Sequence, residues 1–336
     1  MAESTASGRW VRLALLVGGA ALFGFLVWRI GPRAIAASFG ELGWRLLIVL
    51  VFPFCLITAA DTLGWRFAFR RDRVSFWTLV RARVAGEAVN GTTPTGSVGG
   101  EAVKAWLIRD RVPYRESLPS VIVAKTTITM AQALFLLVGI IVAAIALPVR
   151  GRWLLQPMTV LFALEALAVG GFVYAQLSGM VAGGGKLLER MGLVRAAHHG
   201  LPLRRIDRTL SLVYRRRPLR LALSIGFHFL GWVLSAGETW FILWLLDVPV
   251  SPTTAVIVEA CGTAVRFVTF FVPGHLGALE GGNVAVFLAL GLNPAAGMSA
   301  ILVRRVREAA WYGLGFLLLR APGRRPAVVS VREAEG

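Results

Sequence analysis

Charged residues are scarce in this sequence. They make up 16% of its 336 residues, whereas apolar residues make up 56%, compared with roughly 25% and 45–50% in an ordinary soluble domain. Three uncharged runs, 126–149, 221–237 and 281–303, are long enough, at about 1.5 Å per helical residue, to cross most or all of a hydrocarbon core about 30 Å thick. The composition therefore excludes a soluble globule and predicts a polytopic helical membrane protein.

Cysteine and histidine are scarce as well. The two cysteines, Cys55 and Cys261, both lie in apolar stretches, so neither a disulfide framework nor a CxxC metal site is expected. Of the four histidines, His198 and His199 lie in a basic linker and the other two are isolated. Isolated histidines pack or form hydrogen bonds more often than they bind metal. We therefore expect no metal and no cofactor.

Acidic residues are half as numerous as basic ones. The sequence has 18 Asp or Glu and 36 Lys or Arg, for a net charge of +18. Such an excess can indicate nucleic-acid binding, but here the basic residues fall mostly between apolar runs, where they act as orientation signals. We therefore expect no nucleic-acid partner, a bacterial cytoplasmic membrane location and both termini in the cytoplasm. Five cations are predicted inside the membrane: Lys125, Arg266, Arg304, Arg305 and Arg307.

Six long apolar segments predict six transmembrane helices. The first could be mistaken for a signal peptide, but its apolar stretch is too long and 31–33 separates it from the small-residue motif 34–36. We interpret it as an uncleaved helix. The six predicted helices are 11–28, 44–67, 117–149, 153–175, 219–246 and 294–319.

Two basic stretches are expected to face the cytoplasm. The stretch 186–220 has ten basic and two acidic residues, and it fits either an amphipathic linker that touches anionic lipid headgroups or a plain orientation signal. The other stretch follows the second apolar segment and consists of Arg66, Arg70, Arg71, Arg73, Arg81 and Arg83.

Two further regions, 75–108 and 253–290, are interrupted by proline and glycine, which break a helix. Broken backbone at membrane depth is tolerated only where protein or a water-filled cavity satisfies its polar groups. We therefore predict two re-entrant helical hairpins, the first entered from the cytoplasm and the second from outside. The predicted turn residues are Pro94, Gly96, Gly99, Gly100, Pro273, Gly274 and Gly277.

An internal repeat relates the two hairpin regions. In both, a long helix, a broken hairpin and a second long helix follow one another, and the two long helices that precede the hairpins run in opposite directions. An inverted repeat with discontinuous helices is typical of secondary transporters. The alternative is a duplication that merely yields a stable bundle. At an offset of 179 residues, Pro94 maps onto Pro273, Glu101 onto Glu280, and Lys125 onto Arg304.

The predicted fold is thus an all-α membrane bundle of about six transmembrane helices and two re-entrant hairpins in an inverted repeat. It divides the chain into an N-terminal helix with its external loop (1–43), a first repeat (44–149), a fourth helix with a basic linker (150–218), a second repeat (219–320) and a cytoplasmic tail (321–336).

Charges inside the predicted bundle are candidates for a binding cavity, because an ionised side chain at the bilayer centre costs at least about 2.5–3.5 kcal/mol. Inward-pointing helix N-termini would favour an anionic group such as phosphate. Three further acids, Asp61, Glu165 and Glu238, fit proton coupling or neutral hydrogen-bonded residues equally well. The predicted substrate-binding residues are Lys125, Arg304, Arg307, Arg266, Glu101, Glu280, Glu308 and Asn90.

Buried ion pairing is the alternative interpretation of these charges. It would join Arg304 to Glu308, Arg266 to Glu259 or Glu280, and Lys125 to Glu101. Such pairs often gain little net stability after desolvation, so several of them in one bundle favour a polar cavity with a function.

Three motifs carry a resemblance to a known family. The regions 86–104 (GEAVN to GGEAVK) and 270–281 (FFVPGHLGALEG), together with 302–308 (LVRRVRE), resemble the lysylphosphatidylglycerol synthase transmembrane region family of flippase-like membrane proteins over about 13–319. In the multiple peptide resistance factor, such a domain is implicated in moving an aminoacylated lipid and precedes a soluble transferase. This sequence ends soon after the last apolar segment, so we expect no synthase chemistry. It looks closer to stand-alone members, including a hopanoid-associated branch.

The favoured hypothesis is a translocase for an amphipathic membrane lipid, such as a phospholipid, a hopanoid or a polyprenyl phosphate. A non-catalytic scaffold for lipid or hopanoid biosynthesis is the alternative. An intramembrane enzyme is disfavoured, because the sequence contains no HxxxH, HExxH, GxSxG or paired-carboxylate metal pattern.

Overall fold

The computed structural model describes residues 42–70, 74–93, 98–147, 149–178, 216–269 and 275–320, together with a few single residues outside these ranges. This part of the chain consists of nine α-helices and one short 3₁₀ helix, without a β-strand. The prediction of an all-α fold is therefore confirmed. All but two residues of the first predicted segment, 11–28, and most of the basic linker, 186–220, lie outside the described residues.

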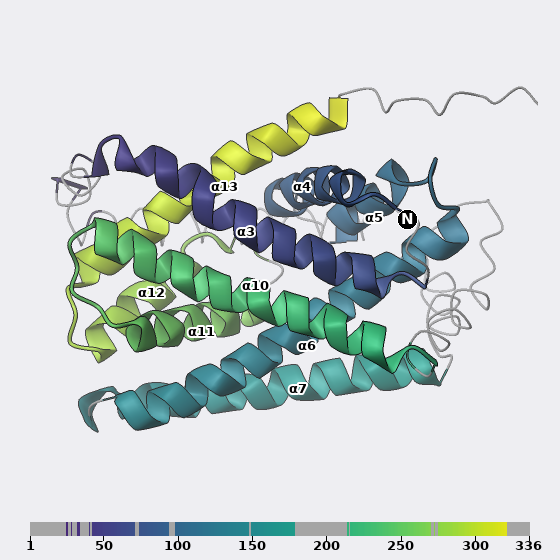
Figure 1. The fold of residues 1–336 in the computed structure, drawn as a ribbon. Coiled ribbons are helices and arrows are strands. Elements are labelled where there is room, and N and C mark those ends of the chain that lie inside the picture. Colours follow the sequence, from purple (N-terminus) through teal and green to yellow (C-terminus); the bar gives the residue numbers. More distant parts are fainter. Residues whose placement is uncertain are drawn as a thin grey trace, which may run out of the picture.

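The helices are labelled as in Figure 1. They are α3 (Arg45–Ala68), α4 (Phe76–Thr92), α5 (Val98–Leu107), α6 (Tyr114–Ala146), η1 (Val149–Leu154), α7 (Leu155–Leu177), α10 (Pro218–Leu245), α11 (Pro252–Val268), α12 (Ala278–Ala289) and α13 (Pro294–Arg320).

Four helices of the described chain are long and apolar enough to cross a membrane. They are Arg45–Ala68, Glu116–Ala146, Gly151–Leu177 and Pro218–Leu245, which correspond to the second to fifth predicted segments. The sixth, α13, has 27 residues but carries three arginines and a glutamate near its middle. Because at least four apolar spans are present, the chain is a polytopic membrane protein.

Local sequence explains where several helices begin. Ser75 precedes α4 and accepts a hydrogen bond from the backbone N–H of Thr78, and Ser251 precedes α11 and accepts one from Thr254. Proline occupies the first position of α10, α11 and α13, where its missing N–H costs nothing. Gly277 precedes α12 with φ of 78°, a left-handed conformation that glycine adopts readily.

The order of helices in α3–α6 is repeated in α10–α13. In each half a long helix is followed by one of 17 residues, then by a short one of 10 or 12, and then by another long one. Helices α3 and α10 lie side by side and run in opposite directions across the molecule (Figure 1). The halves also exchange contacts, since α4 packs on α13 and α11 packs on α6. These observations support an inverted repeat.

The short helices do not reach across a membrane. At 1.5 Å per residue, α5 and α12 are only about 15 and 18 Å long, against a hydrocarbon core of about 30 Å. The pair α4–α5 begins and ends near the end of α3, whereas the pair α11–α12 begins and ends near the opposite end of the bundle, beside the end of α10 (Figure 1). Four of the predicted turn residues, Pro94, Gly96, Pro273 and Gly274, lie outside the described residues.

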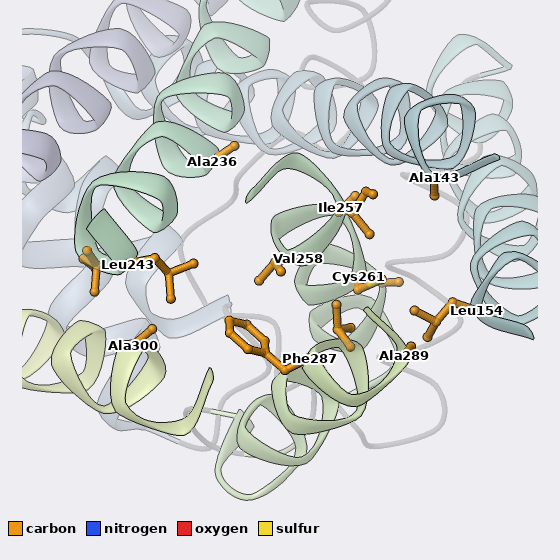
Figure 2. Packing of buried hydrophobic residues seen from close by; sticks show 14 of the residues in the cluster. Ala143, Leu154, Ala236, Leu243, Ile257, Val258, Cys261, Phe287, Ala289 and Ala300 are labelled. Atoms are coloured by element: carbon orange, nitrogen blue, oxygen red, sulfur yellow. The ribbon is translucent and has the colours of Figure 1, made fainter. Parts of the chain in front are cut away.

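An apolar core holds the second broken pair in place. Phe287 of α12 is fully buried and points toward Val258 of α11, Leu243 of α10 and Ala300 of α13 (Figure 2). A Cβ on Gly139 of α6 would lie 2.1 Å from the Cβ of Ala260, so α6 and α11 are in close backbone contact there. This packing fixes the orientation of α11, which carries Glu259 and Arg266.

Candidate functional site

A cavity of about 570 Å³ lies between the two halves of the bundle. Helices α3, α4 and α6 of the first half and α10, α11 and α13 of the second all contribute to its wall. Its charged and ionisable lining residues are Asp61, Arg83, Glu87, Lys125, Arg266, His275, Arg307, Glu308 and Tyr312.

Lys125 is the exposed cation of this lining. It lies on α6, one helical turn before the cavity residues Ile128 and Thr129. The structure gives Lys125 no salt bridge to any residue that it describes, whereas Arg83, Arg266 and Arg307 each have a carboxylate partner. An unpaired ammonium in a cavity at membrane depth is a ready binding group for an anion.

Asp61 joins α3, α4 and α10 at one side of the cavity. Its carboxylate accepts hydrogen bonds from Arg83 Nη2 at 2.6 Å and lies 2.8 Å from His228 Nδ1. The helices approach closely because of two glycines. A Cβ on Gly64 would lie 2.7 Å from the His228 ring, and a Cβ on Gly231 would lie 2.8 Å from Asp61 Oδ1. Each half thus supplies a glycine to accommodate a polar side chain of the other.

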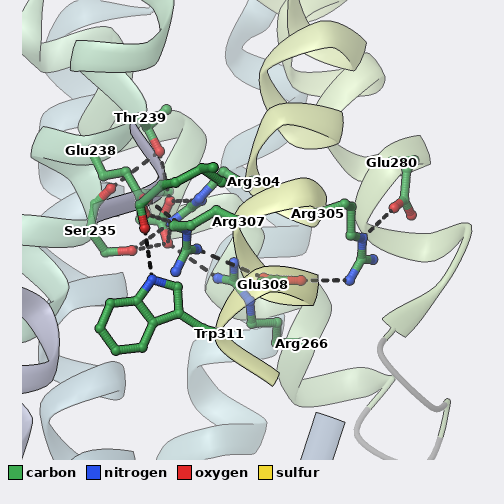
Figure 3. A network of polar contacts seen from close by, with 12 residues as sticks. Ser235, Glu238, Thr239, Arg266, Glu280, Arg304, Arg305, Arg307, Glu308 and Trp311 are labelled. Atoms are coloured by element: carbon green, nitrogen blue, oxygen red, sulfur yellow. Dashed lines mark hydrogen bonds and ion pairs between the residues drawn. The ribbon is translucent and has the colours of Figure 1, made fainter. Parts of the chain in front are cut away.

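Arg304 is the centre of a second polar cluster (Figure 3), which adjoins the cavity through Ser235 and Arg307. Its Nη1 donates to Glu259 at 2.6 Å, and its Nη2 donates to Ser235 at 2.7 Å and to Glu238 at 3.2 Å. Glu238 also lies 2.8 Å from Arg307 Nε. These contacts join α10, α11 and α13 in the membrane interior, where unpaired charges would be costly.

Arg305 points away from this cluster toward Glu280 of α12 (Figure 3). Its Nε donates to Glu280 at 2.8 Å and its Nη1 to Glu308 at 3.1 Å. Glu280 is fully buried in the first turn of α12, so the pair ties the second hairpin to α13. Glu308 remains partly exposed to the cavity.

In the first hairpin, polar side chains hold α4 against α5. Asn90 Oδ1 accepts the backbone N–H of Gly100 at 2.8 Å, and its Nδ2 donates to Glu101 at 3.3 Å. Lys104 lies 2.9 Å from Glu101 and 2.6 Å from Glu87. Asn90 therefore caps the exposed N–H groups at the start of α5.

The remainder of the cavity wall is apolar and aromatic. Phe54 of α3 packs edge-on against Trp311 of α13, and the guanidinium of Arg307 lies 4.1 Å from the centre of the Phe54 ring. The Trp311 indole donates to the backbone carbonyl of Leu50 at 2.7 Å. Trp232 and other apolar side chains complete this wall, so the cavity has one charged side and one apolar side.

The structure separates the predicted binding residues into two groups. Lys125, Arg266, Arg307 and Glu308 line the central cavity. The other four predicted residues make internal contacts outside its lining: Arg304, Glu280, Glu101 and Asn90.

The predicted pairings and turns also differ from the structure in detail. Arg266 lies 3.2 Å from Glu259, one of its two expected partners. Arg304 binds Glu238 and Glu259 rather than Glu308, because the neighbouring helices present carboxylates directly to it. Glu101 binds Lys104 instead of Lys125.

Two predicted turn glycines are part of a helix. Gly99 and Gly100 lie in the first turn of α5 rather than in the break. A Cβ on Gly100 would lie 2.0 Å from the carbonyl oxygen of Gly86, so this glycine permits close contact between α4 and α5. Gly277 does lie in a turn, immediately before α12.

Sequence reasoning missed part of the cavity lining. Arg83 belongs to the predicted cytoplasmic basic patch, but its side chain is largely buried against Asp61 and lines the cavity. Its position four residues before Glu87 on α4 places both on one helix face and was the available signal. Among the described residues, no group of three or more His, Cys, Asp or Glu is arranged to hold a metal ion.

Fold and cavity together define a class, that of polytopic helical membrane proteins with broken helices around a charged central cavity. The chain belongs to the family described as the lysylphosphatidylglycerol synthase TM region, whose model matches residues 9–314. The resemblance inferred from the motifs is thereby confirmed.

Curated relatives are similar over most of their length. A UPF0104 membrane protein of Methanothermobacter thermautotrophicus is 22% identical over 309 residues, covering 87% of this chain and 89% of the relative. A UPF0104 membrane protein of Pyrococcus horikoshii is 23% identical over 312 residues, covering 87% and 91%. No solved structure gives a significant match.

Proposed function

We propose that this protein translocates a membrane lipid with an anionic headgroup, and that the headgroup passes through the central cavity. The observation that carries the proposal is the combination of an unpaired, exposed Lys125 with an aromatic wall in one cavity between the two halves. A phosphate-bearing headgroup would meet the cation, while acyl chains would remain against apolar surface or in lipid.

Charge and size both support a headgroup as the occupant. The lining includes four Lys or Arg side chains and three Asp or Glu side chains, and Lys125 is the one of these four cations without a salt bridge to a described residue. Arg266 offers a planar guanidinium suited to two-point binding of phosphate. A volume of about 570 Å³ lies within the usual range of roughly 300–1,000 Å³ for small-molecule pockets, too small for a whole diacyl lipid with its chains.

The inverted arrangement of broken helices suggests how access would alternate. Each short helix is tied to a neighbouring helix, α5 to α4 through Asn90 and α12 to α13 through Arg305. Rocking of one half against the other would open the cavity first to one side and then to the other. Transport of this kind requires no covalent chemistry, so we propose a transporter rather than an enzyme, located in the cytoplasmic membrane with its basic helix ends inside.

Purified protein in liposomes tests the proposal. A fluorescent phosphatidylglycerol and a fluorescent phosphatidylcholine are placed in the membrane, and bleaching by an impermeant reductant measures the rate at which each crosses. Lys125→Gln is expected to slow movement of the anionic lipid about tenfold or more, because one charge-assisted hydrogen bond contributes about 1.5–3 kcal/mol.

Arg109→Gln is the matched control, since it also removes one cation but lies on an exposed turn after α5. It is expected to leave transport unchanged. Equal transport by Lys125→Gln and wild-type protein would contradict the assignment of the site. Wild-type protein that moves no anionic lipid, yet retains a bound lipid-synthesis partner on purification, would instead favour the scaffold hypothesis.

A further inference from the structure

Glu165 is a buried acid in a helix that otherwise faces outward. Only three residues of α7 are buried, namely Met158, Glu165 and Gln176, and Glu165 has an exposed fraction of 0%. Met158 packs against Cys261 of α11. Glu165 lies seven residues, or about two helical turns, after Met158 on the same face of α7, and α7 packs against α6 and α11.

Neither oxygen of the Glu165 carboxyl has a hydrogen-bond partner among the described residues. The side-chain amide of Gln132 approaches it from α6 without good hydrogen-bond geometry. By contrast, the amide of Gln176, on the same helix, is satisfied by Thr126 and Tyr214. The lack of partners is thus particular to Glu165 and not general to polar residues of α7.

Charged groups on the neighbouring elements do not compensate Glu165. On α11, Glu259 and Arg266 bind each other, and on α6 Lys125 faces the central cavity. Glu116 lies at the first turn of α6, and Arg152 lies on η1 beyond the far end. No salt bridge joins Glu165 to any described cation, so an ionised carboxylate here would be buried without compensation, which costs several kcal/mol.

Gln132 connects this carboxyl to the cavity. Its side chain is part of the cavity lining, and its Nε2 donates weakly to the backbone carbonyl of Thr263 at 3.4 Å. An amide has both donor and acceptor atoms. It can accept from a protonated carboxyl through Oε1 and donate to a deprotonated one through Nε2, so a small rotation serves both states.

We infer that Glu165 is a proton-binding site of this protein, which holds a proton as the neutral carboxylic acid and exchanges it with water in the central cavity past Gln132. In the exchange the carboxyl O–H bond breaks, the proton passes to cavity water, and the carboxylate accepts a hydrogen bond from the amide. Coupling of this exchange to lipid movement rests on the proposed function, whereas proton binding itself does not.

Reaction with dicyclohexylcarbodiimide tests proton binding directly, because this apolar reagent modifies protonated carboxyl groups in apolar surroundings. Folded protein in detergent is treated and the modified residues are mapped by mass spectrometry. Glu165 is expected to be modified, while the ion-paired Glu238 and Glu259 are not. Absence of modification at Glu165 in folded protein, or equal modification at Glu259, would overturn the inference.

Infrared spectroscopy gives a second readout that needs no reagent. The wild-type protein should show a carbonyl band of a protonated carboxyl that disappears in Glu165→Gln and persists in Glu116→Gln, a matched substitution at the partly exposed start of α6. A wild-type spectrum without a band sensitive to Glu165→Gln would overturn the inference. Both readouts are independent of lipid transport.

Coupling is tested in the liposome assay with an imposed pH gradient. Wild-type protein and Glu116→Gln should move anionic lipid faster with the gradient than without it, whereas Glu165→Gln should lose only the response to the gradient. A full response in Glu165→Gln would overturn the coupling. If wild-type protein moves no lipid while Glu165 still reacts with the carbodiimide, the proposed function fails and the proton site stands.

Discussion

Lys125 and Arg304 occupy the same position in the two halves, on α6 and α13 at an offset of 179 residues, but their surroundings differ completely. Lys125 is exposed to the cavity and has no salt bridge to a described residue. Arg304 has an exposed fraction of 8% and binds Glu238, Glu259 and Ser235. The repeat thus duplicates the helix framework, while the cation binds within the protein in one half and remains open to a ligand in the other.

Glu101 and Glu280 show the opposite case, in which one role is kept in both halves. Each lies in the first turn of a short helix, α5 or α12, where a carboxylate interacts favourably with the helix dipole. Each also binds a cation, Lys104 in the first half and Arg305 in the second. Both repeated acids are therefore ion-paired, whereas of the two repeated cations only Arg304 has a salt bridge to a described residue.

Among the substitutions that test this difference between the halves, replacement of Arg304 should cause the largest loss of stability. Arg304→Gln leaves Glu238 and Glu259 short of their cation inside the membrane, and breaking a buried pair in this way typically costs about 3–5 kcal/mol. We expect a large loss of monodisperse protein and a lower melting temperature in detergent, measured by fluorescence-detected size exclusion after heating.

Lys125→Gln is the control at the equivalent position and should melt like the wild-type protein. The double variant Arg304→Gln with Glu259→Gln should recover part of the lost stability, because one buried carboxylate is then neutral. Equal destabilisation by Lys125→Gln and Arg304→Gln would show that the two cations play the same structural role.

Substitutions at the contact between α3 and α10 should cause the next largest loss of stability. Gly231→Ala would place a methyl group against Asp61, and Gly64→Ala would place one against the His228 ring. Because both polar side chains are held by hydrogen bonds, each substitution should separate α3 from α10 and cost about 1–3 kcal/mol. Thermal melting of both variants measures the effect.

Gly226 and Gly237 on α10 provide controls, since a Cβ at either position would meet nothing within 4 Å. Gly226→Ala and Gly237→Ala should be neutral or slightly stabilising, as alanine is the better helix former. If all four alanine variants behaved alike, the close approach of α3 and α10 at these glycines would have no energetic importance.

Much of the fold follows from the sequence, because apolar length and helix breakers are local signals. The segments 44–67 and 219–246 predicted α3 and α10 within a few residues of their observed bounds. The ion pairs within the site cannot be predicted from such local signals. Arg304 and Glu308 share one helix face, but packing brings Glu238 and Glu259 from other helices, and no local pattern encodes that approach.

Arg83 shows how a global rule can mislead at one residue. The basic residues that precede Arg83 in the sequence predict a cytoplasmic patch. Arg83 itself lies on α4, and its guanidinium binds the carboxylate of Asp61 on α3. For Lys125 the apolar sequence around it predicts an intramembrane cation, and the structure places its side chain in the cavity lining. Glu101 and Glu87 form salt bridges with Lys104 and not with Lys125. This pairing is visible only in the folded structure.

The smallest expected loss of stability comes from removal of a helix N-cap, and it should be equal in both halves. Ser75 and Ser251 cap the corresponding helices α4 and α11, with hydrogen bonds from the backbone N–H three residues on at 3.3 and 3.2 Å. Both serines lie at helix starts outside the long apolar spans, so each substitution to alanine should cost about 1 kcal/mol. Unfolding by sodium dodecyl sulfate, followed by tryptophan fluorescence, measures the two losses.

Ser178→Ala, after the last turn of α7, is a neutral control because the Ser178 hydroxyl only donates back to the carbonyl of Ala175. Unequal losses at Ser75 and Ser251 would extend the divergence of the halves from their cations to their helix caps.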